Sequence, residues 1–420
     1  MERCELARRI GAGSRRDGRD PIIVDEKERG RFMAALGEAA GAGGTVLVMD
    51  PSWGAVERDR FAILAQSQIG DGESKSEDQD SELEHGWLCL PTGGSSGMVR
   101  LARHDQDTLS AAVRGFRAHF HMDRINAVGV LPLHHVSGLM AWMRCALTGG
   151  RYVPWIWADL EAGRWPVMGR GDWVLSLVPT QMQRLLGQPE AVERLRRFRA
   201  VFVGGGPAWP DLLERAAEAR LPLAPGYGMT ETAAMVTAVR PEDFLAGRRG
   251  CGSPLPHARV ELGADGGIRI AAESMFRGYY PEWREPGAWA TEDHGRFDEF
   301  GSLQVRGRRD AVIISGGEKI DPGEVEMVLR STGQFSDVAV IGLPDAEWGE
   351  MVVACFPAGP KEPDLGAVKR DIAGHLAQHK RPKRYLSLAT WPRNDQGKVN
   401  RRALIALARG AVDPFRRNDA

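Results

Sequence analysis

Short apolar runs that end near glycine or hydroxyl residues recur along this 420-residue chain and most constrain its fold. The clearest of them are Trp87–Leu90, Ala127–Leu131, Trp173–Val178 and Ala200–Val203. Stretches with apolar residues at helical spacing separate them, as in Asp107–Phe120. Strands that alternate with helices in this way predict an α/β fold of layered sheets and helices, with much of the sheet parallel.

The chain is too long for one hydrophobic core, and its pattern changes after Arg259. From there, short strands and turns replace the earlier alternation. We therefore predict a large N-terminal domain over residues 1–309 and a small α+β C-terminal domain over residues 310–420. A helix is expected over Leu365–Ala377 in the second part.

Composition and charge argue against several classes of function. The formal net charge of −1 gives no support for binding to nucleic acid or to an anionic membrane. The five cysteines are scattered without a C-x-x-C, which indicates neither a zinc ribbon nor a disulfide framework and favours a reduced, cytoplasmic compartment. Residues 1–20 lack a secretory apolar core, no run reaches transmembrane length, and the acidic stretch 70–84 is interpreted as a solvated loop.

A loop of glycines and hydroxyls follows the first apolar run. It consists of Pro91, Thr92, Gly93, Gly94, Ser95, Ser96 and Gly97. Glycines let backbone N–H groups wrap closely around an anion, and the hydroxyls add donors, so the loop is a candidate phosphate cradle. It lacks both the Gly-Lys-[Ser/Thr] ending of a P-loop and the G-x-G-x-x-G pattern. Taken alone, a Gly/Ser surface turn explains it equally well.

Two further segments could hold the base and the phosphates of a nucleotide. One follows the run Ala200–Val203 and consists of Gly204, Gly205, Gly206 and Pro207, where a flat group could lie against the backbone. The other contains Tyr227, Gly228, Met229, Thr230 and Glu231, which combine an aromatic ring, a hydroxyl and a carboxylate suited to Mg²⁺. A tight strand-to-helix turn and a polar turn remain the alternatives.

Charged groups near the C-terminus complete the set. Asp293 suits a ribose diol, and Arg308 offers a fixed cation with several donors. Lys398 follows a glycine and can project from a loop. Taken singly, such residues are most often surface ion pairs or solvated lysines, so their order along the chain carries the argument.

Five segments of this kind in this order resemble the adenylate-forming superfamily of acyl- and aryl-CoA ligases, luciferases and peptide-synthetase adenylation domains. The resemblance runs from about Trp87 to Leu404. It implies an enzyme that uses ATP, Mg²⁺ and coenzyme A, forms an acyl-AMP and then a thioester, and rotates its small domain between the two steps. Retention of Lys398, Glu231, Asp293 and Arg308 argues against a catalytically dead scaffold.

The resemblance also implies a role for each segment. The loop Thr92–Gly97 would close over the β- and γ-phosphates of ATP, while Gly204–Pro207 and Tyr227 would border the adenine. Thr230 would contact the α-phosphate, Glu231 would hold Mg²⁺, and Asp293 with Arg308 would bind the ribose. Asp310 would be the hinge, Lys398 would bridge the substrate carboxylate and the α-phosphate, and Gly316 with Gly317 would line the pantetheine tunnel.

Two positions depart from the family pattern. Val99-Arg100 stands where the phosphate loop usually continues with Pro-Lys, which keeps the charge but changes the side chain. Thr291-Glu292-Asp293 stands in place of Thr-Gly-Asp. Glu292 therefore brings an extra side chain toward the expected nucleotide site.

The acid is suggested by the segment Leu131–Leu139, which resembles the acid-pocket motif of the superfamily, with His135 at its histidine. Arg144 lies seven residues after Ser137, about two helical turns, so both could face one pocket. An arginine there suits a substrate with a second carboxylate. The pattern looks most like the o-succinylbenzoate–CoA ligases of cyanobacteria, which act on the route to phylloquinone or menaquinone.

Several alternatives stay open. Arg144 could form a helix-surface ion pair, and His135 could be a satisfied packing histidine. The protein could be another aryl- or acyl-CoA ligase, or it could pass its acyl-AMP to a carrier protein. The expected partners are a small carboxylic acid, ATP and CoA, with no nucleic acid and no stable membrane insertion, and a homo-oligomer is possible.

Overall fold

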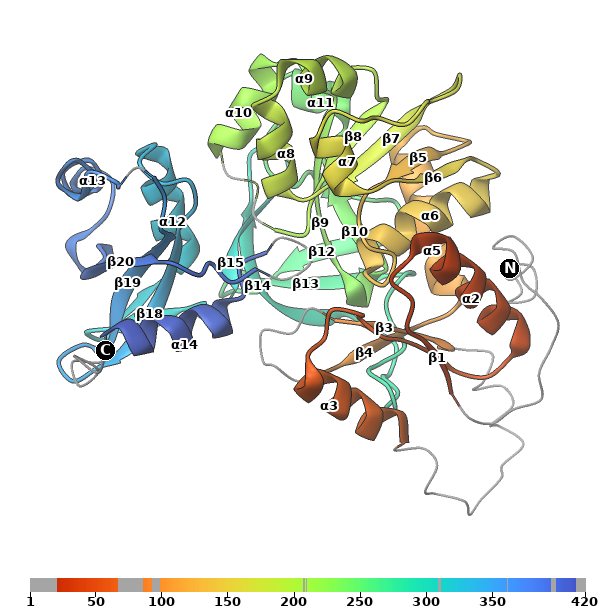
Figure 1. Cartoon of the computed structure of the whole chain (residues 1–420), viewed down its shortest axis with the longest axis horizontal. Helices are drawn as coiled ribbons and strands as arrows, with labels where there is room; N and C mark the ends of the chain where they lie inside the picture. The colour runs from red at the N-terminus through yellow and green to blue at the C-terminus, as the bar shows by residue number, and fades with distance from the viewer. Residues whose placement is uncertain are drawn as a thin grey trace.

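The computed structural model describes residues 21–66, 86–92, 99–206, 208, 210–308, 311–360, 362–393 and 398–412. Within these residues, four β-sheets and their helices form a large body and a smaller unit beside it (Figure 1). The predicted α/β fold with a large N-terminal and a small α+β C-terminal part is confirmed. None of the described helices is both long and apolar enough to cross a membrane.

The first sheet positions the glycine-rich loop. Its strand order is β1-β2-β3-β4, with β1 to β3 parallel and β4 antiparallel to β3. The strands are β1 (Ile22–Val24), β2 (Val46–Val48), β3 (Leu88–Pro91) and β4 (Leu101–His104), accompanied by α2 (Arg29–Ala42) and α3 (Ala55–Gln66). The candidate phosphate loop is thus the connection of the β3–β4 hairpin.

The second sheet has seven strands in the order β11-β10-β9-β8-β7-β5-β6. They are β5 (Asn126–Gly129), β6 (Tyr152–Pro154), β7 (Trp173–Leu177), β8 (Ala200–Val203), β9 (Leu223–Met229), β10 (Ala234–Ala238) and β11 (Ser253–Pro254). Strands β5 to β9 are parallel, as predicted, and β10 reverses direction. The carboxyl ends of β8 and β9 therefore meet at one edge, where the predicted adenine segments lie.

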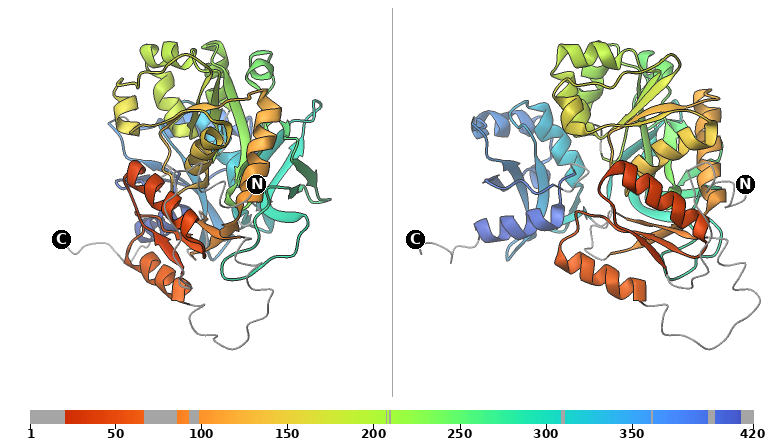
Figure 2. Two further views of the ribbon diagram at one scale, coloured as in Figure 1. Left: turned by 90° about the vertical axis from the view of Figure 1, so that its right-hand side faces the viewer. Right: turned by 45° about the vertical axis from the view of Figure 1, so that its right-hand side comes forward.

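Helices cover both faces of this sheet because its buried strands alternate their side chains (Figure 2). Val201 and Leu175 pack on one side against α8 (Pro179–Leu186), α9 (Pro189–Leu195) and α10 (Pro210–Glu218). Phe202 and Val174 pack on the other side against α5 (Gln106–Phe120) and α6 (Val136–Thr148). The short helices α7 (Trp157–Glu161), α11 (Pro241–Leu245) and the 3₁₀ turn η1 (Thr230–Thr232) complete this part.

A third, antiparallel sheet leads to the small unit. It contains β12 (Ala258–Leu262), β13 (Gly267–Ala272), β14 (Trp289–Phe297) and β15 (Leu303–Arg308) in that order. The fourth sheet contains β16 (Ile313–Ser315), β17 (Glu318–Ile320), β18 (Ala339–Asp345), β19 (Gly349–Pro357) and β20 (Arg384–Leu388), with α12 (Pro322–Ser331), α13 (Leu365–Ala373), η3 (Gln378–Lys380) and α14 (Arg401–Val412). The domain boundary predicted at residues 309 and 310 lies outside the described residues and stays a prediction.

One prediction about local structure was wrong. The helix expected over Leu365–Ala377 ends at Ala373, because Gly374 follows and favours helical backbone poorly. The segment around Tyr227, for which a polar turn was an alternative, belongs to strand β9. Its glycines reflect close packing rather than a bend, since a Cβ on Gly228 would lie only 1.9 Å from the carbonyl oxygen of Ala234 on β10.

Candidate active site

The base of the glycine-rich loop is closed by a backbone hydrogen bond. The N–H of Thr92 donates to the carbonyl oxygen of Arg100 at 3.0 Å, next to the cross-strand pair of Pro91 and Leu101. Gly93, Gly94, Ser95, Ser96 and Gly97 lie outside the described residues. The residues at the two ends of the loop are therefore held together by the β3–β4 hairpin.

Arg100, the residue that departs from the family pattern, lies beside Tyr279, an aromatic residue that the sequence did not indicate as part of the site. Its guanidinium carbon lies 5.1 Å from the ring centroid of Tyr279. The hydroxyl of Tyr279 donates to Oε1 of Glu231 at 2.6 Å. Burial and the charge of Glu231 raise the pKa of Tyr279, which keeps the phenol protonated as a donor. Tyr279 thus orients the carboxylate predicted to hold Mg²⁺.

Thr230 is held from behind by a buried histidine. Nε2 of His104 lies 2.8 Å from the carbonyl oxygen of Thr230, and its Nδ1 lies 3.1 Å from the hydroxyl of Thr108. Burial lowers the pKa of His104 to about 4, despite the opposing bond to Thr230. The ring is therefore neutral, and Nε2 must carry its proton because a carbonyl oxygen only accepts. His104 fixes the backbone where β9 passes into η1.

The predicted adenine and ribose residues are brought together. The hydroxyl of Tyr227 donates to Oδ2 of Asp293 at 2.7 Å. Asp293 on β14 is the direct cross-strand partner of Arg308 on β15, which places these two side chains side by side. Burial and the charge of Asp293 raise the pKa of Tyr227, so its hydroxyl remains a donor. Glu292 is exposed and points to the opposite face of the strand, away from Asp293.

Lys398 reaches this cluster from the small unit. A Cβ placed on Gly205, whose φ is +77°, would lie 3.8 Å from Nζ of Lys398. Although the residue as a whole is exposed, loss of water around its ammonium group and the nearby charge of Arg308 lower the pKa of Lys398, while Asp293 opposes that change. Lysine, aspartate and arginine from three separate segments therefore share one electrostatic environment.

Gly204, Gly205 and Gly206 form the surface that Lys398 approaches. Gly204 follows β8 directly, and its N–H donates to the carbonyl oxygen of Leu177 at 3.3 Å. A Cβ on Gly206 would lie 3.8 Å from the ring of Pro179, in ordinary contact. Pro207 lies outside the described residues. The left-handed backbone of Gly205 is the feature that requires glycine here.

His135, predicted in the acid pocket, is part of a cluster with His134 and Asp50. Nε2 of His135 lies 3.8 Å from Oδ2 of Asp50, and Nε2 of His134 lies 3.3 Å from Oδ1. Burial, together with the charges of His134 and Lys398, lowers the pKa of His135 to about 3. Because its buried Nε2 has no hydrogen-bond partner within the described part of the chain, His135 is not a satisfied packing histidine.

Arg144 is buried inside the body, which contradicts the alternative of a helix-surface ion pair. Its residue exposure is 5%, its guanidinium carbon lies 4.0 Å from the ring centroid of Phe116 on α5, and Nε has no hydrogen-bond partner in the described part of the chain. No carboxylate pairs with it among the residues that the structure describes. Burial lowers the pKa of Arg144 to about 10, so it stays charged at neutral pH. Ser137 is half-buried on the same helix, two turns earlier.

The residues predicted to line the path of CoA lie on the small unit. Gly316 and Gly317 form the turn between β16 and β17 and have φ angles of +59° and +82°. A Cβ on Gly316 would lie 3.1 Å from the ring of Trp348. The described contacts do not connect this turn with Lys398. The predicted hinge, Asp310, lies outside the described residues.

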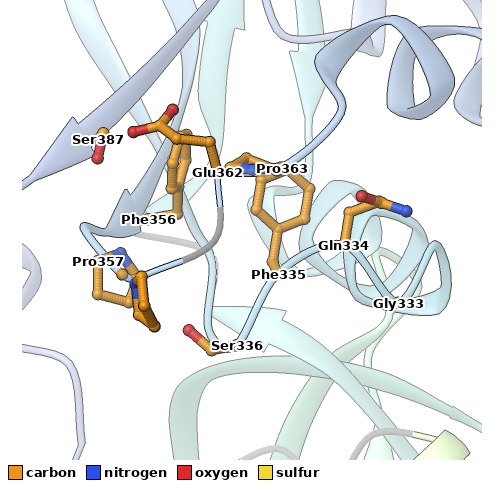
Figure 3. Close-up of a pocket in the computed structure, with 11 residues that line it drawn as sticks. Gly333, Gln334, Phe335, Ser336, Phe356, Pro357, Glu362, Pro363 and Ser387 are labelled. Atoms are coloured by element: carbon orange, nitrogen blue, oxygen red, sulfur yellow. The ribbon is translucent and has the colours of Figure 1, made fainter.

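A hollow on the small unit is separate from this cluster (Figure 3). Its volume is about 330 Å³, and Phe335 and Phe356 form part of its wall, with ring centroids 5.3 Å apart. Glu362 is the sole ionisable group among the described residues that line it. The hollow therefore offers little chemistry, and the charged groups converge at Lys398 instead.

Comparison with protein families decides the class of the protein. A model of the AMP-binding enzymes matches residues 22–280, and a model of the AMP-binding enzyme C-terminal domain matches residues 324–398. The chain belongs to the AMP-binding enzymes. This AMP-binding enzyme is 30% identical over 356 residues to a 2-succinylbenzoate–CoA ligase of Enterococcus faecalis, which covers 79% of this chain and 72% of that protein.

Two further relatives extend the comparison of this AMP-binding enzyme. It is 30% identical over 385 residues to a probable 2-succinylbenzoate–CoA ligase of Mycobacterium tuberculosis, covering 87% of this chain and 93% of that protein. Its fold is similar to that of o-succinylbenzoate CoA synthetase from Bacillus subtilis in complex with the acyl-adenylate OSB-AMP. That match has a TM-score of 0.74 and 22% identity and covers 96% of this chain and 91% of the other.

Proposed function

We propose that this AMP-binding enzyme is an ATP-dependent acid–CoA ligase that forms an acyl-AMP and then a CoA thioester. The observation that carries the proposal is the approach of Lys398, from the small unit, to Gly205, Asp293 and Arg308 on the large body. Attack of a carboxylate on the α-phosphorus brings two anions together. A mobile cation held at that point can neutralise both.

The other groups of the large body would position ATP. Asp293, oriented by Tyr227, would accept hydrogen bonds from the ribose, and Arg308 beside it would add a fixed positive charge. The loop Thr92–Gly97 would supply backbone and hydroxyl donors to the phosphates. Glu231 fits Mg²⁺, because one carboxylate oxygen is held by Tyr279 while the other has no partner among the described residues. When bound, Mg²⁺ would neutralise phosphate charge.

The acid is proposed to be 2-succinylbenzoate, which would place the enzyme on the route to menaquinone or phylloquinone. Two observations support this choice: the names of the relatives and the buried guanidinium of Arg144, which has no carboxylate partner among the described residues. A plain fatty acid would leave that charge uncompensated. A second carboxylate would pair with it, while Ser137 and His135 would border the acid between Arg144 and Lys398.

Thioester formation would follow after rotation of the small unit. Lys398 occupies the point where the carboxylate is activated, so it must withdraw before a thiol can reach the acyl-AMP. We propose residues 310–420 as the moving part, Asp310 as its hinge, and Gly316 with Gly317 as the turn that borders the pantetheine of CoA. One active site can then serve both half-reactions.

The test is a turnover assay with purified protein. ATP, Mg²⁺, CoA and a panel of acids would be supplied, and AMP and thioester would be measured separately. We expect 2-succinylbenzoate to be converted most efficiently, with stoichiometric AMP and thioester. Better turnover of benzoates or fatty acids would overturn the choice of acid. AMP formation without any thioester would point to transfer onto a carrier protein, and no AMP from any acid would refute the activity.

A further inference from the structure

Three side chains with metal-ligating atoms meet beside the acid pocket. Asp50 follows strand β2, and His134 and His135 immediately precede helix α6. One ligand atom from each lies within 4.8 Å of the other two. Because the fold brings together segments that are distant in the sequence, no local sequence motif indicates this cluster.

The arrangement is not that of a hydrogen-bonded triad. His134 approaches Asp50 at 3.3 Å and His135 approaches it at 3.8 Å, yet neither buried Nε2 has a hydrogen-bond partner among the described residues. The two histidines and the aspartate are each more than nine-tenths buried, with exposures of 7%, 9% and 7%. Oδ1 of Asp50 also accepts from both the N–H and the hydroxyl of Ser52. Both imidazoles thus face the same carboxylate, with His134 in ion-pair range of Oδ1 and His135 farther from Oδ2.

We propose that Asp50, His134 and His135 form a binding site for one divalent transition metal ion such as Zn²⁺. Bonds of about 2.0–2.2 Å in a tetrahedral site place neighbouring ligand atoms roughly 3.3–3.6 Å apart. The histidine-to-aspartate approaches of 3.3 and 3.8 Å, which run to different carboxylate oxygens, lie close to that spacing, and all three ligand atoms lie within 4.8 Å of one another. Two imidazoles and one carboxylate suit Zn²⁺, Co²⁺ or Ni²⁺, whereas Mg²⁺ prefers oxygen ligands alone.

Three protein ligands leave a fourth position for water or for an anion. His135 lies close enough to Lys398 for the two to interact electrostatically, so the site borders the place where an acid would be activated. A bound ion would take the carboxylate of the acid as its fourth ligand and add positive charge beside Lys398. This consequence rests on the proposed function: micromolar Zn²⁺ would inhibit adenylation, and excess Mg²⁺ would not relieve the inhibition. Binding of the metal itself does not depend on that function.

The experiment is a titration of the full, metal-stripped protein with Co²⁺ and Zn²⁺, followed by optical spectroscopy and chelator competition. One ion per chain is expected, with the visible absorption of four-coordinate Co²⁺ held by nitrogen and oxygen. Absence of binding would overturn the proposal. A strong sulfur-to-metal charge-transfer band would do the same, because it would assign the ion to cysteines such as Cys89 or Cys251.

Variants test the ligands independently of enzymatic activity. Asp50→Asn and His134→Gln should each weaken Zn²⁺ binding by at least about 10-fold, since even loss of a partner beyond the ligands costs 10–100-fold. The control His375→Gln removes an exposed histidine of the small unit and should leave the affinity unchanged. Circular dichroism checks that each variant folds. Equal affinity in all three variants, or loss in the control alone, would overturn the site even if the enzyme proves to be a CoA ligase.

Discussion

Replacing Arg144 by methionine should stabilise the protein while impairing its handling of a dicarboxylate. Burial lowers the pKa of Arg144 well below its ordinary value, to about 10, and each tenfold change in an equilibrium is worth about 1.4 kcal/mol, so burying the charge costs about 3 kcal/mol. The contact with Phe116 returns about 1–2 kcal/mol. Arg144→Met should therefore raise the unfolding free energy by about 1–2 kcal/mol. Since the lowered pKa still exceeds neutrality, this gain applies throughout the range from pH 5 to 8.

Arg103 provides a matched control for this experiment. It is as buried as Arg144, with 4% exposure, but it donates to the carbonyl oxygens of Gly86 and Pro281 at 3.2 and 2.9 Å. Arg103→Met leaves those oxygens without their charged donor and should destabilise the protein by about 2–4 kcal/mol. Both variants would be unfolded in urea, and Arg144→Met would also be assayed with 2-succinylbenzoate and with a monocarboxylate that lacks the distal group.

The two measurements on Arg144→Met must move in opposite directions if the reasoning is right. Stability should rise, and kcat/KM should fall by about 10–100-fold for the dicarboxylate but much less for the monocarboxylate, because only the former loses a charged hydrogen bond. A loss of stability similar to that of Arg103→Met would show that Arg144 is compensated inside the fold. Equal kinetic losses for both acids would remove it from the acid pocket.

Three further outcomes follow from the nucleotide site and its surroundings. Lys398→Ala should abolish adenylation while sparing thioester formation from supplied acyl-AMP, and comparable losses in both half-reactions would contradict its role. In the unmodified protein, the adenylation rate should fall as pH rises through the lowered pKa of Lys398. Tyr227→Phe removes the donor to Asp293 and should raise KM for ATP about 10–100-fold, whereas Tyr385→Phe, whose buried hydroxyl has no partner among the described residues, should leave it unchanged. His104 has a pKa of about 4 in the folded protein and 6.5 in the unfolded chain, so the unfolded chain binds more protons between these values. The contribution of His104 to the unfolding free energy should therefore fall by about 1.4 kcal/mol per pH unit as pH drops from 6.5 to about 4. A His104→Gln variant with the same acid dependence in urea unfolding would exclude that histidine as the cause.

The sequence predicted the segments that carry charge but not the contacts that orient them. Tyr227, Asp293 and Lys398 stood out because their order along the chain matched a family pattern, and the structure places their side chains in one region. Tyr279 and Asp50 could not be found in this way, because each meets its partner through a side-chain contact between segments that are distant in the sequence. Aromatic and acidic residues of that kind are common, so no local signal separates them from ordinary core or surface positions.

The glycines around Tyr227 show that local sequence also fails to predict how closely backbone segments pack. A Gly-Tyr-Gly sequence indicates a turn by local propensity, yet the segment is extended and pairs with β10. The decisive fact is a distance across strands, because Gly228 lies too close to Ala234 for any side chain. Local sequence carries information about conformational freedom, whereas such crowding is fixed only after the sheet has assembled.

Two positive charges of different kinds bear on how one carboxylate of a dicarboxylic acid could be selected. Arg144 is fixed by burial within the body, while Lys398 arrives with the small unit. Ser137 and Arg144 lie about 10 Å apart along the helix at a rise of about 1.5 Å per residue. An acid that pairs with Arg144 can present only its other carboxylate toward Lys398. A dicarboxylate too short to reach both Arg144 and Lys398 would leave one charge unpaired, so the buried arginine would select both the class of acid and the end that reacts.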